Sequence, residues 1–198
     1  FYKSLTVFEQ LKELIGIAYA HNSLSSAALS QGNLESAIEH ATKALSIRQG
    51  INDKRGEGSA NNRLGEIYNK KGDYDKALVY FFNNITLYKS LDNFEDLALT
   101  NMNIGKVYLA SGDYKKAISF GKKAFIYYDE IGNNGVVAEV LLLIGQTYYY
   151  QKNYLRSKEY CEKSTYFAKE YNRQEVLFKS YLFLSKIEEA QKNLSEAL

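Results

Sequence analysis

The residues of this chain that could carry chemistry are two histidines and one cysteine. His21, His40 and Cys161 have none of the spacings of metal ligands, either with one another or with a pair of carboxylates. We expect His21 to be packed or half-exposed on its helix, His40 to face solvent, and Cys161 to be a small buried thiol. The glycines recur at regular intervals and form no phosphate-binding loop. The sequence therefore predicts no enzyme activity, no metal site and no cofactor for this chain.

The composition narrows the partners and the compartment. The 198 residues are 45% hydrophobic and 24% charged, and the net charge is +2 with both signs mixed along the chain. This balance gives no reason to expect nucleic acid or an anionic membrane as a partner. The longest apolar run, near residues 136–144, is interrupted by Glu139, so no membrane span is expected. A single free thiol favours a reducing compartment such as the cytoplasm and is compatible with a periplasm.

An internal repeat indicates the elements that position these residues. The stretch "LGEIYNKKGDYDKAL" begins at Leu64, and "IGKVYLASGDYKKAI" begins at Ile104. Weaker copies begin at Leu24, Ile144 and Leu184, so the five copies are spaced 40 residues apart without insertions. A fixed period of this length is typical of a protein built from stacked repeats.

The columns of the repeat have packing explanations. One column is always a large aliphatic residue and is predicted to be core: Leu24, Leu64, Ile104, Ile144 and Leu184. The next column is always small, which lets a neighbouring helix approach closely: Ser25, Gly65, Gly105, Gly145 and Ser185. Further on, a Gly that can end a helix, replaced by Lys in the last two copies, precedes an Asn or Asp that can cap the next helix: Gly32–Asn33, Gly72–Asp73, Gly112–Asp113, Lys152–Asn153 and Lys192–Asn193.

Each repeat is therefore predicted to contain a helix A, a tight turn, a helix B and a connection to the next repeat. The connections carry turn residues such as "GINDKRG" from Gly50 and "IGNNG" from Ile131. The matching place near residues 11–13 has no turn residue. At that point either the connection is tighter or two helices run together.

These columns resemble the tetratricopeptide repeat (TPR) family. The match is the aliphatic residue followed by Gly, then Tyr, then "GDY", then Ala, as in "LGEIYNKKGDYDKAL". The common unit of that family has ~34 residues, and the period of 40 is similar to the long-helix type of spindle-orientation adaptors, kinesin light chains and bacterial peptide sensors. The resemblance implies an all-α fold, a right-handed α-solenoid of antiparallel helix pairs (the TPR superhelix), with ligands held on the concave face formed by the A helices.

The repeat also predicts the domain organisation. We expect residues 1–198 to form a single TPR array, with residues 1–11 as the end of a preceding helix B. Full repeats are expected at 12–51, 52–91, 92–131 and 132–171, and a partial fifth repeat at 172–198. Neither end looks like the polar cap that a solenoid needs, so we expect a segment of a longer protein. The alternative is that flanking residues are disordered or not included.

The predicted binding strip follows from the spacing of helix A. Residues one and four beyond the small column and three before it should point inward, and a few neighbours extend the strip. The strip consists of Asn62, Glu66, Asn69, Lys70, Leu99, Met102, Asn103, Lys106, Leu109, Leu142, Gln146, Tyr149, Tyr150, Lys179, Leu182 and Lys186. It is polar in the second repeat, apolar in the third and fourth, and charged in the fifth. We expect it either to hold an apolar or amphipathic segment, with Lys106 and Lys186 available to a carboxylate, or to be packed against itself.

Three functions fit these features. The favoured one is a scaffold that binds a protein or peptide on the concave helix-A face and has no catalytic activity of its own. The alternative is the sensory or regulatory region of a bacterial signalling protein, a kinase or transcription regulator whose output domain lies outside this chain. A third is self-association through exposed repeat ends or the Tyr149–Tyr150 patch.

Overall fold

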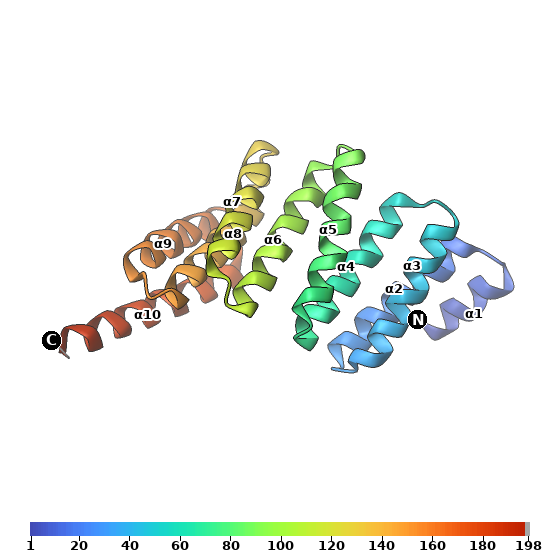
Figure 1. Ribbon diagram of the computed structural model, residues 1–198, viewed down its shortest axis with the longest axis horizontal. Coiled ribbons are helices and arrows are strands. Elements are labelled where there is room, and N and C mark those ends of the chain that lie inside the picture. Colours follow the sequence, from blue (N-terminus) through green and yellow to red (C-terminus); the bar gives the residue numbers. More distant parts are fainter. Residues whose placement is uncertain (197–198) are drawn as a thin grey trace. The chain divides into compact units, whose positions relative to one another are not determined.

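The protein is entirely helical in the part of the chain that the structure describes. The computed structural model describes residues 1–196, and over that range it contains ten α-helices and no strand (Figure 1). The all-α prediction is therefore confirmed. The helices form two compact units, residues 1–92 and 93–198. Among the described helices, none combines the length and the apolar character needed to cross a membrane.

The first unit contains five helices. They are α1 (Tyr2–Gln10), α2 (Leu14–Ser30), α3 (Leu34–Gly50), α4 (Lys54–Lys71) and α5 (Tyr74–Ser90). Each helix packs against the next one in the chain, and α2 also contacts α4. The A helices of successive repeats, α2 and α4, therefore lie side by side within this unit.

The second unit is built in the same way. Its helices are α6 (Phe94–Ser111), α7 (Tyr114–Glu130), α8 (Asn134–Tyr150), α9 (Tyr154–Glu170) and α10 (Gln174–Glu196). The central helix α8 packs against α7 and α9, and it also contacts both α6 and α10. The three A helices α6, α8 and α10 therefore form one continuous face.

The same tight turn separates the helices every 20 residues. Its first residue has a positive φ angle at Lys12, Gly32, Asn52, Gly72, Asp92, Gly112, Gly132, Lys152 and Asn172. The following residue closes the turn, and in six cases its side-chain oxygen accepts a hydrogen bond from the amide three residues later: Asn33, Asp53, Asp73, Asn93, Asp113 and Asn153. The predicted turns inside the first four repeats are confirmed. At residues 11–13 a turn separates two helices, although Lys12 must take the left-handed conformation.

The predicted turn at Lys192–Asn193 is wrong, because α10 continues through it to Glu196. Lysine itself does not prevent the turn, since Lys152 adopts a φ of 61° at the matching position. A left-handed conformation costs a non-glycine residue about 1–2 kcal/mol, and at Lys152 the contacts between α9 and α8 offset this cost. Residues 197 and 198, the end of the predicted fifth repeat, lie outside the described range.

The helix pairs are held together at the small and aromatic columns. A Cβ atom added to Gly145 would lie 2.7 Å from the Cys161 sulfur, and one added to Gly65 would lie 2.6 Å from the Phe81 ring, so both glycines are required by close approach of helix B. One aromatic pair stacks between helix A and helix B in three successive repeats, with ring centroids 5.7, 5.6 and 5.5 Å apart: Tyr68–Tyr80, Tyr108–Phe120 and Tyr148–Tyr160. The repeated letters therefore have packing roles.

Candidate functional site

The cysteine of this chain is not placed for chemistry. Cys161 is fully buried on α9, as the sequence predicts. Burial raises the pKa of its thiol to about 11, so it is protonated at neutral pH and is a poor nucleophile. Within residues 1–196, no three His, Cys, Asp or Glu side chains are grouped to hold a metal ion.

The two histidines meet in the first unit. Their Nδ1 atoms are 2.9 Å apart, and both residues are buried. The prediction that His40 faces solvent is therefore wrong. Its column contains the stacking partners Tyr80, Phe120 and Tyr160, but the first repeat has Ala28 where the second, third and fourth repeats have tyrosine. Without that tyrosine to stack on, His40 hydrogen-bonds to His21 across the α2–α3 interface.

A groove lies on the A-helix face of the second unit. It has a volume of about 940 Å³, and its walls come from α6, α8 and α10, with Tyr114 from the start of α7. Along α8 the lining runs from Glu139 near the helix N-terminus to Tyr150 at its C-terminal end. The lining residues are Lys106, Leu109, Ala110, Tyr114, Glu139, Leu142, Leu143, Gln146, Tyr150, Asn172, Arg173, Gln174, Glu175, Val176, Lys179 and Phe183.

One end of the groove is charged. Lys106 on α6 donates to Glu139 on α8 over 2.9 Å, and both side chains are more than one-third exposed. On α10, Lys179 donates to Glu175 over 2.5 Å. Lys179 and, more weakly, Arg173 hold the pKa of Glu175 below its ordinary value. Glu175 is therefore paired with Lys179 and also lies near the positive charge of Arg173.

The other end of the groove is aromatic. The rings of Tyr114 and Tyr150 stack with centroids 6.4 Å apart, and Tyr150 also meets Phe183 edge-on at 6.4 Å. Tyr150 remains 50% exposed, whereas Phe183 is buried. This end therefore offers an open aromatic ring that meets a buried one.

The structure brings part of the predicted strip into this groove. Six predicted residues line it: Lys106, Leu109, Leu142, Gln146, Tyr150 and Lys179. Met102 and Asn103 are buried instead, and Met102 packs in a core cluster with Val137 and Val140. Leu99 and Tyr149 pack partly against the core, while Leu182 and Lys186 are exposed and do not line the groove.

Sequence reasoning missed several groove residues. Glu139 shares a column with Leu99 and Lys179, which the prediction included, so the repeat alone could have identified it. Arg173 and Glu175 belong to a turn and to the first turn of α10, where the helix-A spacing says nothing. Tyr114 begins a helix B and was outside the predicted strip. Tyr114, Arg173 and Glu175 become neighbours of α8 only through the stacking of successive repeats.

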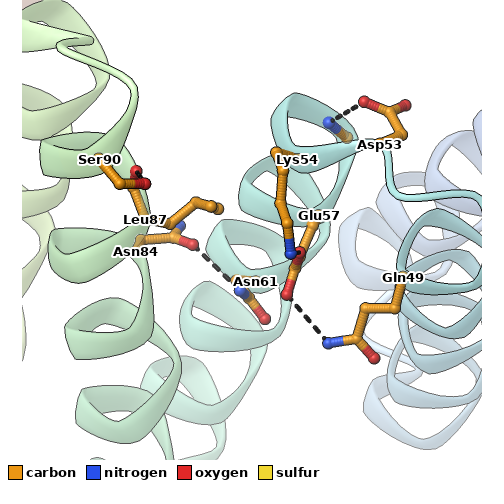
Figure 2. Close-up of polar contacts among 9 residues, drawn as sticks. Gln49, Asp53, Lys54, Glu57, Asn61, Asn84, Leu87 and Ser90 are labelled. Atoms are coloured by element: carbon orange, nitrogen blue, oxygen red, sulfur yellow. Dashed lines mark hydrogen bonds and ion pairs between the residues drawn. The ribbon is translucent and has the colours of Figure 1, made fainter.

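The corresponding face of the first unit is occupied by its own contacts. The Asn61 side chain donates to the Asn84 side-chain oxygen over 3.1 Å (Figure 2). Asn84 in turn donates to the Asn62 side-chain oxygen over 2.8 Å, so these amides tie α4 to α5. Glu66 pairs with Arg63 over 2.7 Å, and Lys70 donates to the carbonyl of Leu29 over 3.0 Å. Asn69 is half-buried. Three of the four predicted residues of this unit are therefore held by internal contacts on a polar surface, whereas the buried side-chain oxygen of Asn69 has no hydrogen-bond partner among the described residues.

Comparison with family models identifies repeats over most of the chain. Two models, each described as a tetratricopeptide repeat, match residues 56–128 and residues 18–50 and 138–171. No curated protein sequence matches the chain.

Several solved structures share the fold. The apo form of RapI is 18% identical, with a TM-score of 0.76 over 91% of this chain and 73% of that one. A signal transduction ATPase with numerous domains (STAND) and a TPR sensor, from Pyrococcus horikoshii, is 22% identical with a TM-score of 0.79. The match covers 93% of this chain but 29% of that protein. A Rap protein solved with competence and sporulation factor is 15% identical with a TM-score of 0.69, over 96% of this chain and 58% of that one. At these identities the likeness shows the fold alone.

Proposed function

Because this chain belongs to the tetratricopeptide repeat family, we propose that it is a protein-interaction scaffold with no catalytic activity of its own. The ligand is a peptide segment of a partner protein. The binding site is the groove between α6, α8 and α10 of the second unit.

The observation that carries this proposal is where the groove lies in the repeat. Its lining comes mostly from positions at which the repeats differ, such as Gln146 against Glu66, and Tyr150 against Lys70. The positions that repeat are used for packing, as the Gly145–Cys161 approach illustrates. A volume of about 940 Å³ falls in the range of roughly 300–1,000 Å³ that is usual for ligand sites. A groove between parallel A helices also suits an elongated ligand.

The second candidate function is the sensory or regulatory region of a signalling protein. The STAND ATPase with a TPR sensor favours it, because this chain matches 29% of that protein. The Rap protein was solved with competence and sporulation factor. Under this alternative the same groove receives the signal, and an output domain outside this chain responds.

The proposal is tested by selecting ligands without assuming their identity. A displayed library of random nonapeptides is panned against the whole chain, and the selected peptides are measured by fluorescence anisotropy. Gln146→Arg, in the groove, should weaken binding by about tenfold or more, as substitutions at central contacts do. The control is Leu155→Ala on α9, where the side chain is 77% exposed and does not line the groove. Equal binding to both variants, or no selected peptide, would contradict the proposal.

A further inference from the structure

We propose that the groove takes an amphipathic segment with an acidic side chain at one end and an aromatic or aliphatic anchor at the other. This inference rests on the proposed function and adds the chemistry of the ligand. The acidic group is received near Arg173 and Lys179. The anchor lies against Tyr114, Tyr150 and Phe183.

The charges of the lining carry the first half of the inference. The groove is lined by three cations, Lys106, Arg173 and Lys179, and two anions, Glu139 and Glu175, for a net charge of +1. Lys106 is engaged by Glu139. Lys179 is paired with Glu175, and Arg173 adds a further positive charge nearby. A ligand carboxylate between Arg173 and Lys179 would balance this charge, and a guanidinium is well shaped to bind a carboxylate through two hydrogen bonds.

The order of the lining carries the second half. Glu139 and Tyr150 are 11 residues apart on α8, which corresponds to about 16 Å along the helix axis. The charged and aromatic ends are therefore separated by the reach of roughly five extended residues. The half-exposed Tyr150 ring, which meets Tyr114 and Phe183, presents apolar surface that a partner's anchor can cover. The acid and the anchor should accordingly be three to five residues apart in the ligand.

The Lys106–Glu139 pair acts as a specificity device in this arrangement. It joins α6 to α8 beside the charged end. Glu139 competes with a ligand carboxylate for Lys106 and repels it. Removing this charge while keeping the shape, by Glu139→Gln, should therefore strengthen the binding of acidic ligands.

The test uses the nonapeptides selected on the whole chain and retains those weakened by Gln146→Trp, which narrows the groove without changing its charge. We expect these peptides to be enriched in Asp or Glu three to five residues from Phe, Tyr, Leu or Ile. Replacing the acid by its amide, or introducing Arg173→Gln, should weaken binding by about tenfold, and Glu139→Gln should strengthen it several-fold. Groove-dependent peptides that are basic or insensitive to Arg173→Gln would overturn the inference and leave the proposed function intact. Absence of any groove-dependent peptide would overturn both.

The buried histidine pair carries a second inference, independent of the groove. We infer that the His21–His40 contact is a pH-responsive fastening between α2 and α3. With both rings neutral, the Nδ1–H of one histidine donates to the Nδ1 of the other over 2.9 Å. One added proton preserves this hydrogen bond. A second proton leaves two donors and two like charges facing each other in a buried interface.

The surroundings favour the neutral form of His21. Burial first, then His40 and Lys43 on α3, lower the pKa of His21, while Glu9 on α1 and Glu39 on α3 act in the opposite direction. The Tyr2 ring of α1 meets the His40 ring edge-on at 6.3 Å. From α4, Lys70 bonds to Leu29 and Glu57 to Gln49, both more than two helical turns from the pair. Because the folded-state pKa is lowered, the stabilisation is present above the ordinary histidine value near 6.5 and is lost as the pH falls below it.

The repeat itself supplies the matched variants. Ala28→Tyr with His40→Tyr installs the Tyr–Tyr stack of the second and fourth repeats, and His21→Asn installs the residue of the second and third repeats. Between pH 6.5 and 5, the unfolding equilibrium constant of the native chain should rise by up to about tenfold per pH unit more than that of the double variant. His21→Asn provides the same comparison if the double variant does not fold. Parallel pH profiles, or two histidines that titrate independently near pH 6.5 by NMR, would overturn the inference.

Discussion

The A-helix faces of α4 and α8 occupy the same positions of the repeat, but the face of α4 is polar and engaged in its own contacts, whereas the face of α8 lines an open groove. On α4 the variable positions are polar and engaged, with Glu66 paired to Arg63 and Lys70 bonded to Leu29. On α8 the matching positions, Gln146 and Tyr150, line an open groove. The columns beneath them are alike in both helices, since each contains a glycine under helix B and a stacked tyrosine. The residues that recur in each repeat therefore hold the helix pair together, whereas the residues that vary determine whether its face is available to a ligand.

The largest effect is expected where a shared letter is changed. Gly145→Ala should destabilise the protein by about 1–3 kcal/mol, because the new Cβ would lie 2.7 Å from the Cys161 sulfur. Chemical unfolding measures the effect. Gly135→Ala in the same helix is the control, since its Cβ would meet no atom closer than 3.8 Å, and it should stabilise by about 0.5–1 kcal/mol. Adding Cys161→Ala, which copies Ala41 of the first repeat, should recover part of the loss. Equal behaviour of the two glycines would refute the packing role.

A smaller and equal effect is expected at the aromatic column of both faces. Tyr68→Leu and Tyr148→Leu each remove one ring from a stack with centroids 5.5–5.7 Å apart. Each should cost about 1 kcal/mol in the free energy of unfolding, the usual value of an aromatic pair beyond its buried area. Urea unfolding of the two variants should give similar losses. A loss confined to one variant would mean that the column is not a shared packing device.

The smallest effect on stability is expected from exchanging the variable letters. Gln146→Glu with Tyr150→Lys gives α8 the letters of Glu66 and Lys70. Tyr150 is half-exposed, and its replacement removes the ring contacts with Tyr114 and Phe183, so the free energy of unfolding should fall by no more than about 1 kcal/mol. Affinity for the selected nonapeptides should nevertheless fall by about tenfold or more. The reciprocal change, Glu66→Gln with Lys70→Tyr, leaves the groove intact and should preserve binding. Loss of folding with the α8 exchange would show that these residues are part of the core.

Much of the fold could be predicted from the sequence because packing acts locally and repeats. Gly72 and Asp73 are typical of a helix end followed by an N-cap. In the structure Gly72 takes a positive φ angle and Asp73 caps α5. The failures have non-local causes. His40 is buried because it meets His21 of the preceding helix and the Tyr2 ring of α1. The turn predicted at Lys192–Asn193 does not form, and α10 continues to Glu196.

The candidate groove is less predictable than the fold, because it depends on contacts between successive repeats. The strip prediction treated each helix A alone, so it found Lys106 and Gln146 but also included Met102, which the neighbouring α8 buries. Arg173 and Glu175 enter the groove from a turn and a helix start. Their position depends on how α10 stacks on α8, which no single repeat encodes.

The central claim is that residues at the variable positions of the second unit form the ligand site. A crystal structure of the whole chain with a selected nonapeptide tests this claim most directly. The account predicts a peptide lying along α6, α8 and α10, with its anchor side chain against Tyr150 and Phe183. A peptide bound to the outer surface of α7 and α9, or a groove filled by the protein's own side chains, would contradict it.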